Sequence, residues 1–336
     1  MQIWNFSDDH TGGFAVPEGF PGSAVNGRAV ALGYFDGVHI GHREILSRLC
    51  QLAADRNLTA MVHTFANMPK SKTNGSHVND NAHLTTLTEK CGIFDRIGIN
   101  EAALYPFSES ISSMKAVDFL DLHIKNLLHA KVVVAGEDYR FGFEREGDMH
   151  LLASWGKENG IEVFPVPPVF QNERIISSTW IRDCVRNGRM SLAASLLGGP
   201  ISYEGIVQAG KRLGRTLGFP TANLKIEDDK VIPAYGVYAS VLITGNSLYP
   251  SITSVGLRPT VNTSDFSPLI ETMVYDHTLD LYGQKIRVFL ISFIRPEYRF
   301  PDVHALQEQV QKDMVEVRHF HDVHAYDYSN LLSGVI

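Results

Sequence analysis

Short apolar runs alternate with a helical pattern through the first part of the chain. Residues 29–35, 59–65, 131–141 and 161–169 have the length and apolar content of buried strands. Residues 42–57, between the first two runs, carry apolar side chains at helical spacing. Four of these side chains share one face of the expected helix: Ile45, Leu49, Leu52 and Ala53. Because a helix that joins two strands implies a crossover connection, the pattern predicts an α/β fold with a parallel sheet.

The pattern changes near Gly198–Pro200. From there the strand-like runs are short, rich in β-branched residues and separated by Gly and Pro, and they cover 203–210, 235–245, 251–261 and 284–294. This spacing predicts a small antiparallel barrel. A helical pattern over 303–320 follows it. We therefore expect two domains, residues 1–197 and residues 198–336.

Charge and composition restrict the partners. The chain has 336 residues, 44% of them hydrophobic and 20% charged, with a formal net charge of −7. This balance is typical of globular proteins, and the negative charge argues against a nucleic-acid partner. No apolar run is long enough to span a membrane, so no membrane partner is expected.

The cysteines and the first residues indicate the compartment. Cys50, Cys91 and Cys184 are odd in number and far apart, which fits a reducing environment better than a disulfide framework. A signal peptide has a basic segment followed by an apolar one, and the first residues do not show this pattern. We expect a cytoplasmic protein, and its oligomeric state stays open.

The stretch GYFDGVHIGH places two histidines around a glycine at the predicted start of a helix. His39 and His42 could bind a metal, pack in a core or handle phosphate. The common zinc-binding spacings are absent and no cysteine is close, which argues against zinc. Gly37 and Gly41 allow a tight backbone, and a helix N-terminus offers free N–H groups and a positive dipole end. We therefore favour phosphate binding, with His42 in the first helical turn.

Two further stretches carry candidate chemistry. ISSTWIR, at 176–182, offers hydroxyls that could cap a helix and an arginine that could bind phosphate. Near residues 204–224, several glycines occur without the spacing of a P-loop, so taken alone they indicate turns. His319, His321 and His324 could bind a metal, but we expect a polar tail there.

Together the motifs resemble a known family. HxGH with ISSTxIR resembles the adenylyl- and cytidylyltransferases. GYFDGVHIGH, LTTLTEK, VVVAGEDYRFGFEREGD and ISSTWIR resemble more closely the bacterial bifunctional riboflavin kinase/FAD synthetases. The resemblance runs from about residue 28 to about residue 320. It implies a Rossmann-like nucleotidyltransferase domain and a six-stranded antiparallel β-barrel kinase domain with a terminal helix.

The resemblance implies that the first domain adenylylates FMN to FAD with ATP and releases pyrophosphate. Mg²⁺ would bridge phosphate oxygens, while positioning and charge neutralisation would carry the rate. His39 and His42 would stabilise the ATP phosphates, with Arg182 closing from the other side. The implied nucleotide-binding residues are Gly33, Phe35, Asp36, Gly41, Ser178 and Thr179, and the implied flavin-binding residues are Asp138, Phe141, Gly142 and Arg145.

For the second domain the resemblance implies phosphorylation of riboflavin to FMN with ATP. In the stretch GFPTANL, Thr221 and Asn223 would coordinate the Mg²⁺ of MgATP through oxygen atoms. Glu271 would accept the proton of the flavin hydroxyl, and Arg258 would lie at the flavin rim. The glycines that would lie at the nucleotide are Gly205, Gly210, Gly214 and Gly218.

Two departures from the family pattern leave alternatives open. The family usually reads TFDPHP where this chain has TFANMP, so Ala66, Asn67 and Met68 replace an acid, a proline and a histidine. Ser254 stands in a second altered run, a milder change because serine retains a hydrogen-bonding group. The alternatives are a riboflavin kinase with weak or lost FAD synthetase activity, and a non-catalytic flavin-sensing regulator.

Overall fold

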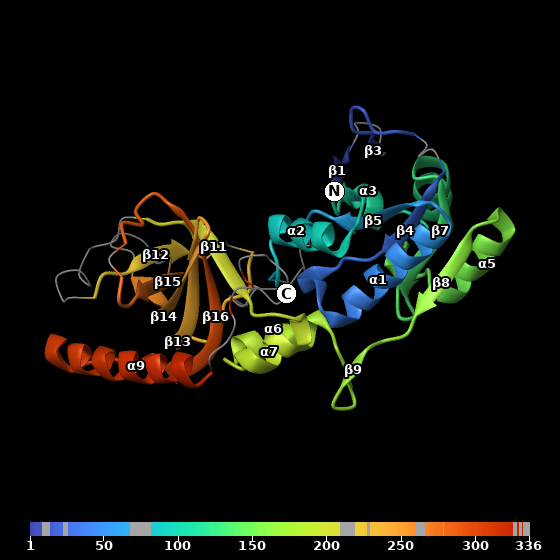
Figure 1. The fold of residues 1–336 in the computed structure, drawn as a ribbon. Helices are drawn as coiled ribbons and strands as arrows, with labels where there is room; N and C mark the ends of the chain where they lie inside the picture. Colours follow the sequence, from blue (N-terminus) through green and yellow to red (C-terminus); the bar gives the residue numbers. More distant parts are fainter. Residues whose placement is uncertain are drawn as a thin grey trace. The chain divides into compact units, whose positions relative to one another are not determined.

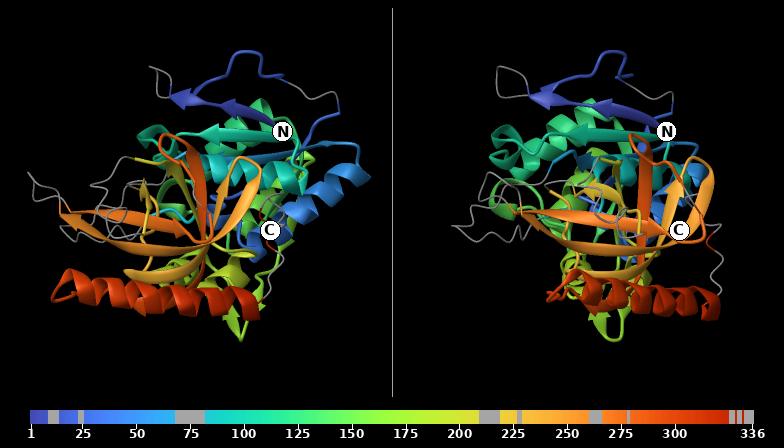
Figure 2. Two further views of the ribbon diagram at one scale, coloured as in Figure 1. Left: turned by 60° about the vertical axis from the view of Figure 1, so that its left-hand side comes forward. Right: turned by 90° about the vertical axis from the view of Figure 1, so that its left-hand side faces the viewer.

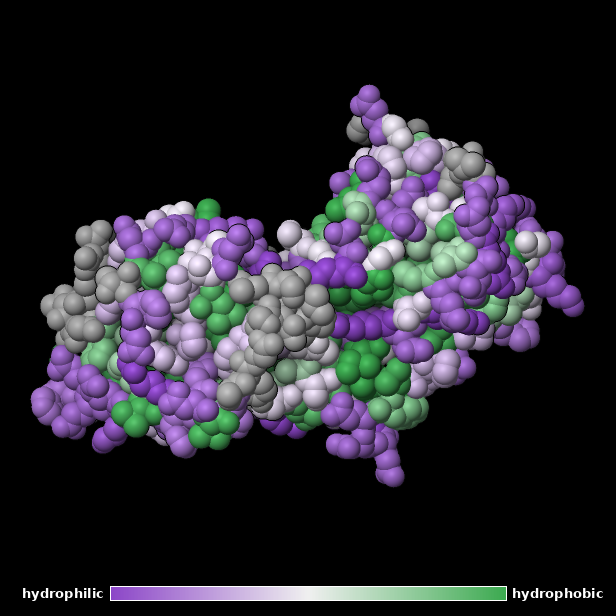
Figure 3. Space-filling view, in the orientation of Figure 1, coloured by the Kyte–Doolittle hydropathy of each residue, from purple (hydrophilic) through white to green (hydrophobic). Residues whose placement is uncertain are grey.

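The computed structural model describes residues 1–8, 14–22, 26–67, 82–208, 219–226, 229–259, 266–277, 279–324, 328 and 331. Two compact units make up the chain, Met1–Ser177 and Ser178–Ile336. Hydrophilic and hydrophobic residues are interspersed over the face of both units drawn in Figure 3. Among the described helices, none is both long and apolar enough to cross a membrane.

The first unit is built on a six-stranded sheet whose order, within the described residues, is β1-β6-β5-β4-β7-β8. All five neighbouring pairs in this order run parallel. This confirms the predicted α/β fold. The strands are β1 (Gln2–Asn5), β4 (Arg28–Leu32), β5 (Thr59–Phe65), β6 (Glu101–Tyr105), β7 (Ala130–Gly136) and β8 (Glu162–Val166).

Helices cover both faces of this sheet (Figure 1). Every residue of β4 is buried, so alternate side chains of that strand enter two separate cores. Ala29 and Ala31 face the core under α1 (Ile40–Asp55) and α2 (Leu87–Ile97). Val30 and Leu32 face the core on the other side. That core is covered by α4 (Ala116–Phe119), the π-helix η2 (Leu120–Leu127) and α5 (Met149–Asn159).

Shorter elements complete the first unit. Strands β9 and β10 pair as an antiparallel hairpin, as do β2 and β3. The bounds of these elements are β2 (Ser7–Asp8), β3 (Phe14–Ala15), η1 (Asp36–Val38), α3 (Glu109–Ser112), η3 (Phe143–Arg145), β9 (Phe170–Gln171) and β10 (Arg174–Ile175).

Three predicted strands of the first unit end earlier than expected. The run 161–169 ends as a strand at Val166, and a turn ends each of the other two. The run 29–35 stops being a strand after Leu32, since Phe35 has a left-handed backbone with φ 55°. The run 131–141 stops at Gly136, because the N–H of Tyr139 turns back to donate to the Gly136 carbonyl at 3.0 Å. In both cases a turn at the carboxyl end of the strand overrides a continuous apolar pattern.

The second unit contains a six-stranded antiparallel sheet in the order β11-β16-β13-β14-β15-β12, counting its described residues. Its ends come together where the N–H of Gln208 donates to the Asn223 carbonyl at 3.0 Å. The sheet is therefore nearly closed, which confirms the predicted barrel. The strands are β11 (Ser202–Ile206), β12 (Ala222–Lys225), β13 (Gly236–Thr244), β14 (Ser247–Pro259), β15 (Phe266–Val274) and β16 (Lys285–Pro296).

Helices accompany the barrel in the same unit, and Figure 2 shows the last of them, in red, lying along it. This helix, α9 (Val303–Val323), packs Val317 against barrel residues such as Ala239 and confirms the predicted terminal helix. The polar tail expected at 319–324 is wrong for His321, which is 9% exposed and bonds to Tyr328. Two further helices precede the barrel, α6 (Ser178–Arg186) and α7 (Met190–Leu197), and the predicted boundary near Gly198–Pro200 lies after both.

One core of the first unit contains buried imidazole rings among aromatic ones. His63 and His123 are 1% and 3% exposed. Both lie against Tyr105, whose ring centroid is 4.5 Å from that of His63 and 5.2 Å from that of His123. Burial lowers the pKa of His63 to about 3 and that of His123 to about 4. Both rings are therefore neutral in the native protein at neutral pH.

These histidines should make the first unit sensitive to acid. Below pH 6.5, the ordinary pKa of histidine, the unfolded chain binds protons that the buried native rings do not bind. The native protein therefore becomes less stable as the pH falls. Each ring should cost about 1.4 kcal/mol per pH unit down to its native pKa. Thermal unfolding of the wild type should show this decline between pH 6.5 and pH 4, and His63→Phe should flatten it.

The matched control is His150→Gln, which changes an exposed imidazole of the same unit and should leave the decline as it is. Equal acid sensitivity of wild type and His63→Phe would show that His63 does not control it.

Candidate functional site

The turn between β4 and α1 has an unusual backbone that the sequence explains. The ring of Phe35 is fully buried. A Cβ on residue 33 would lie only 2.7 Å from Cζ of this ring, so the position requires glycine. Phe35, Gly37 and Val38 all have positive φ angles, of 55°, 79° and 40°. Such a run of left-handed residues persists only when its surroundings enforce it, and strain of this kind is common at functional sites.

His39 and His42 stack on each other at the start of α1. Their ring centroids are 3.6 Å apart and their planes differ by 16°. The backbone N–H of His42 donates to Nδ1 of His39 at 3.3 Å, so His39 caps the helix. Because Nδ1 accepts a hydrogen bond, the ring proton of neutral His39 is on Nε2. A Cβ on Gly41 would be 3.3 Å from the His39 ring, so this glycine leaves room for the stack.

Electrostatics keep His42 neutral. Burial is the largest cause that lowers its pKa well below the ordinary value, and the electrostatic effects of His39 and Lys90 lower it further. Nδ1 of His42 is buried and has no hydrogen-bond partner within the part of the chain that the structure describes. The ring of Phe35 lies 5.3 Å from that of His42, edge to face. The predicted position of His42 in the first helical turn is confirmed.

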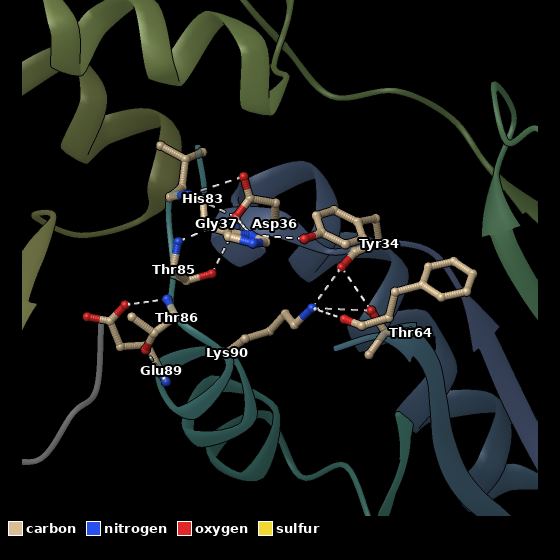
Figure 4. A network of polar contacts seen from close by, with 11 residues as sticks. Tyr34, Asp36, Gly37, Thr64, His83, Thr85, Thr86, Glu89 and Lys90 are labelled. Carbon is tan, nitrogen blue, oxygen red and sulfur yellow. Dashed lines mark hydrogen bonds and ion pairs between the residues drawn. The ribbon is translucent and has the colours of Figure 1, made fainter. Parts of the chain in front are cut away.

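Asp36 ties this turn to a distant segment (Figure 4). Its carboxylate is 2% exposed and accepts the N–H of Leu84 at 2.9 Å and that of Thr85 at 3.4 Å. In return the N–H of Gly37 donates to Oγ1 of Thr85 at 3.1 Å. The next residue, Thr86, begins α2 with a capping box. The turn before α1 and the turn before α2 are thus one hydrogen-bonded assembly.

Lys90 lies beneath the same assembly and is 4% exposed. Its Nζ donates to the carbonyls of Phe65 and Tyr34 at 2.9 and 3.2 Å, and to Oγ1 of Thr64 at 3.4 Å. Sequence reasoning did not select this residue. Lys90 occupies an apolar-face position of α2, between Leu87 and Phe94, and that misplaced charge is the signal that could have found it.

The altered TFANMP corner is still held in place. Ala66 donates its N–H to the Tyr105 carbonyl at 2.8 Å, and Oδ1 of Asn67 accepts the N–H of Phe107 at 2.7 Å. Asn67 thus joins the ends of β5 and β6 in this chain. Met68 lies outside the described residues.

The predicted flavin-binding stretch follows β7. Asp138 and Arg145 are exposed, whereas Phe141 is 6% exposed and stacks on Tyr139 with ring centroids 5.5 Å apart. Gly142 has φ 76°, and a Cβ there would meet the Ala116 backbone at 2.6 Å. The flavin contacts of this stretch stay a prediction.

Within ISSTWIR, Ile176 and Ser177 end the first compact unit, and the residues from Ser178 to Arg182 belong to α6 in the second. Ser178 and Thr179 lie in its first turn, and the Arg182 side chain is 7% exposed. Their closure on the triphosphate stays a prediction.

A second candidate site lies on neighbouring barrel strands. Asn223 of β12 is directly opposite Glu271 of β15, which in turn is opposite Ser254 of β14. Because paired residues share a sheet face, these three side chains project on the same side. The Asn223 amide donates from Nδ2 to the Thr221 carbonyl at 3.4 Å. Its Oδ1 is buried and has no partner among the residues described here.

The structure describes only one of the four glycines predicted to lie at the nucleotide of the kinase site. Gly205 lies on β11, where a Cβ would meet the Leu224 side chain at 3.3 Å. Three other glycines and one side chain lie outside the described part of the chain: Gly210, Gly214, Gly218 and the side chain of Arg258.

The described part of the chain has no cluster of the usual metal-binding side chains. No group of three or more His, Cys, Asp or Glu side chains there could hold a metal ion. An oxygen site built from Asn and Thr is a different donor set, suited to a hard cation.

Comparison with known families matches two models in succession. A model described as FAD synthetase matches residues 23–180, and a model described as riboflavin kinase matches residues 197–321. The first range contains the histidine-bearing turn, and the second contains the barrel.

Individual relatives match over most of their length. The bifunctional riboflavin kinase/FMN adenylyltransferase of Escherichia coli (strain K12) is 36% identical over 298 residues, 88% of this chain and 93% of that protein. The protein of the same description from Bacillus subtilis (strain 168) is 32% identical over 295 residues, 87% of this chain and 92% of that protein.

A solved structure shares the fold. It is titled a macrolide-efflux protein from Streptococcus pneumoniae, is 32% identical to this chain and superposes with a TM-score of 0.79. The match covers 88% of this chain and 95% of that one.

Proposed function

Because the chain belongs to the bifunctional riboflavin kinase/FMN adenylyltransferase family, we propose that it phosphorylates riboflavin to FMN and then adenylylates FMN to FAD. ATP serves both reactions, and the second releases pyrophosphate. The observation that supports the second activity most is the stacked His39–His42 pair at the N-terminus of α1.

We assign adenylyl transfer to the carboxyl ends of β4 and β5, the edge where α/β sheets bind ligands. A phosphate oxygen of FMN attacks the α-phosphorus of ATP, and the bond to the pyrophosphate oxygen breaks. The N–H groups at the start of α1 and Nε2–H of His39 stabilise the negative charge that develops. Neutral His42 adds one N–H donor. Ser178, Thr179 and Arg182 bind the triphosphate in this proposal.

We assign phosphorylation of riboflavin to the barrel. Thr221 and Asn223 would hold Mg²⁺, and the buried Oδ1 of Asn223 fits a hard cation because it has no partner among the described residues. Mg²⁺ would neutralise phosphate charge during transfer. Glu271 accepts the proton of the ribityl hydroxyl as that oxygen attacks the γ-phosphorus of ATP. Its position opposite Asn223 brings base and cation ligand to one place.

The alternatives receive less support. The TFANMP corner has lost the acid and the imidazole usual in the family, but its backbone remains tied to β6 through Ala66 and Asn67. The intact turn at His39–His42 favours an active transferase over a flavin-sensing regulator. A kinase with a slow second step would accumulate FMN, which the assay below detects.

We also propose a cellular compartment and a domain boundary for this protein. No disulfide joins Cys50, Cys91 or Cys184, and thiols of this kind support the cytoplasm as the compartment. A domain boundary near Gly198–Pro200 is supported by the residues that the two family models match.

The adenylylation site is tested with FMN, ATP and Mg²⁺, followed by chromatography for FAD. His42→Ala should lower the rate of FAD formation by about 10²–10³-fold, the usual loss when one donor to a transition-state charge is removed. Its conversion of riboflavin to FMN should be unchanged. His150→Gln, at an exposed position, should behave as wild type in both reactions. Full FAD formation by His42→Ala would refute the assignment.

The kinase site is tested with riboflavin, ATP and Mg²⁺. Glu271→Gln keeps the shape of the side chain but cannot accept the proton, so FMN formation should fall by about 10²–10⁴-fold. Adenylylation of supplied FMN should continue. Glu316→Gln is the control, since Glu316 is exposed on α9. If Glu271→Gln phosphorylates riboflavin at the wild-type rate, another group is the base.

A further inference from the structure

The buried lysine under the histidine-bearing turn has a definite geometry. Its ammonium group donates to oxygens at the ends of two parallel strands, the Phe65 carbonyl of β5 and the Tyr34 carbonyl just after β4. The hydroxyl of Thr64 joins both, since it accepts from Lys90 and donates to the Tyr34 carbonyl at 2.9 Å. Nζ also lies 4.7 Å from the centre of the Tyr34 ring.

We propose that Lys90, in its protonated form, is a positioning residue for adenylyl transfer. It fixes the end of β4 against the end of β5 and so sets the place of the turn that carries His39 and His42. The inference rests on the proposed adenylylation function.

The path from the lysine to the histidines is short. Tyr34, whose carbonyl Lys90 holds, is followed at once by Phe35, whose buried ring contacts His42 edge to face at 5.3 Å. The next residue is Asp36, which binds the N–H groups of Leu84 and Thr85. A shift of the Tyr34 carbonyl would therefore move both anchors of the turn.

The charge matters because of the number of donors. An ammonium group has three N–H bonds for its three oxygen partners, whereas a neutral amine has two and points a lone pair at the third oxygen. Loss of the proton should therefore release one strand end. The charge also lies close enough to His42 to lower the pKa of that ring, which helps to keep it neutral.

The groups around Lys90 set where it titrates. Burial is the main cause that lowers its pKa, to about 8, and the charges of Asp36 on η1 and of Cys91 on α2 oppose this. Tyr34, whose ring lies 4.7 Å from Nζ, is hydrogen-bonded to His83 at 2.9 Å, and His42 of α1 is a further titratable neighbour. Lys90 should therefore be half deprotonated near pH 8 rather than near the ordinary 10.5.

Activity and stability should respond to that proton in opposite directions. Between pH 8 and pH 10.5 the unfolded chain still holds the lysine proton that the native protein has released, so this group makes the native state more stable as pH rises. Adenylylation should decline over the same range. A merely structural lysine would not slow the reaction while the fold becomes more stable.

The experiment measures kcat and KM for FAD formation from FMN and ATP between pH 6.5 and pH 9.5, with thermal unfolding at each pH. Lys90→Met should lower kcat by about 10–10²-fold, the effect of a displacement near 1 Å, and should abolish the decline above pH 8. Thr64→Val removes one oxygen partner of the ammonium group and should move the decline to lower pH. Lys125→Met, at an exposed position, is the control that keeps the wild-type profile.

Each outcome decides the matter. Wild-type kcat in Lys90→Met, or a decline above pH 8 that persists in that variant, would overturn the role of Lys90. If Lys90→Met does not fold, the wild type and Thr64→Val decide, and identical profiles of these two would overturn it. A wild type that makes FMN but no FAD would instead refute the proposed adenylylation, and this inference with it.

Discussion

A buried carboxylate holds the proposed adenylylation site together. Asp36 is removed from water, and burial of a charged group is costly unless hydrogen bonds replace the lost solvent. The N–H groups of Leu84 and Thr85 supply those bonds, and Gly37 donates back to Thr85. The left-handed backbone of Phe35 and Val38 depends on this fixation, because such a conformation is unfavourable for side chains of that size.

The fold places this turn where ligand chemistry is possible. A strand buried on both faces leads into it, and a helix whose N-terminus is capped by His39 leads out of it. The turn is therefore held on both sides, and the N-terminus of α1 is presented at the carboxyl edge of the sheet. In the barrel the candidate site is positioned by strand register instead. Strand pairing places Asn223 opposite Glu271, and no local motif is needed.

Much of this could be predicted from local sequence. Strand-like runs joined by a helical pattern predicted the parallel sheet, and short runs separated by Gly and Pro predicted the barrel. GYFDGVHIGH predicted a helix N-terminus that binds phosphate. The long-range bonds could not be predicted, because Asp36 meets Leu84 across 48 positions of the chain and no periodicity encodes that contact. Nor did the pattern show that His321 is buried, since neighbouring polar residues hid its place in α9. Lys90 was not predicted because a single charged residue on an apolar helix face is normally taken as a break in the hydrophobic pattern, not as a buried functional group.

The central claim is that Asp36 holds the turn before α1 against the turn before α2, and amide hydrogen exchange at Leu84 and Thr85 tests it most directly. Both N–H groups donate to one oxygen of this side chain, Oδ1, which an asparagine could replace, so the variant used is Asp36→Ala, in which every side-chain acceptor is lost. The account predicts that both amides exchange at least about tenfold faster than in the wild type, as local opening becomes less costly. Unchanged exchange at both amides in a folded Asp36→Ala protein would contradict it.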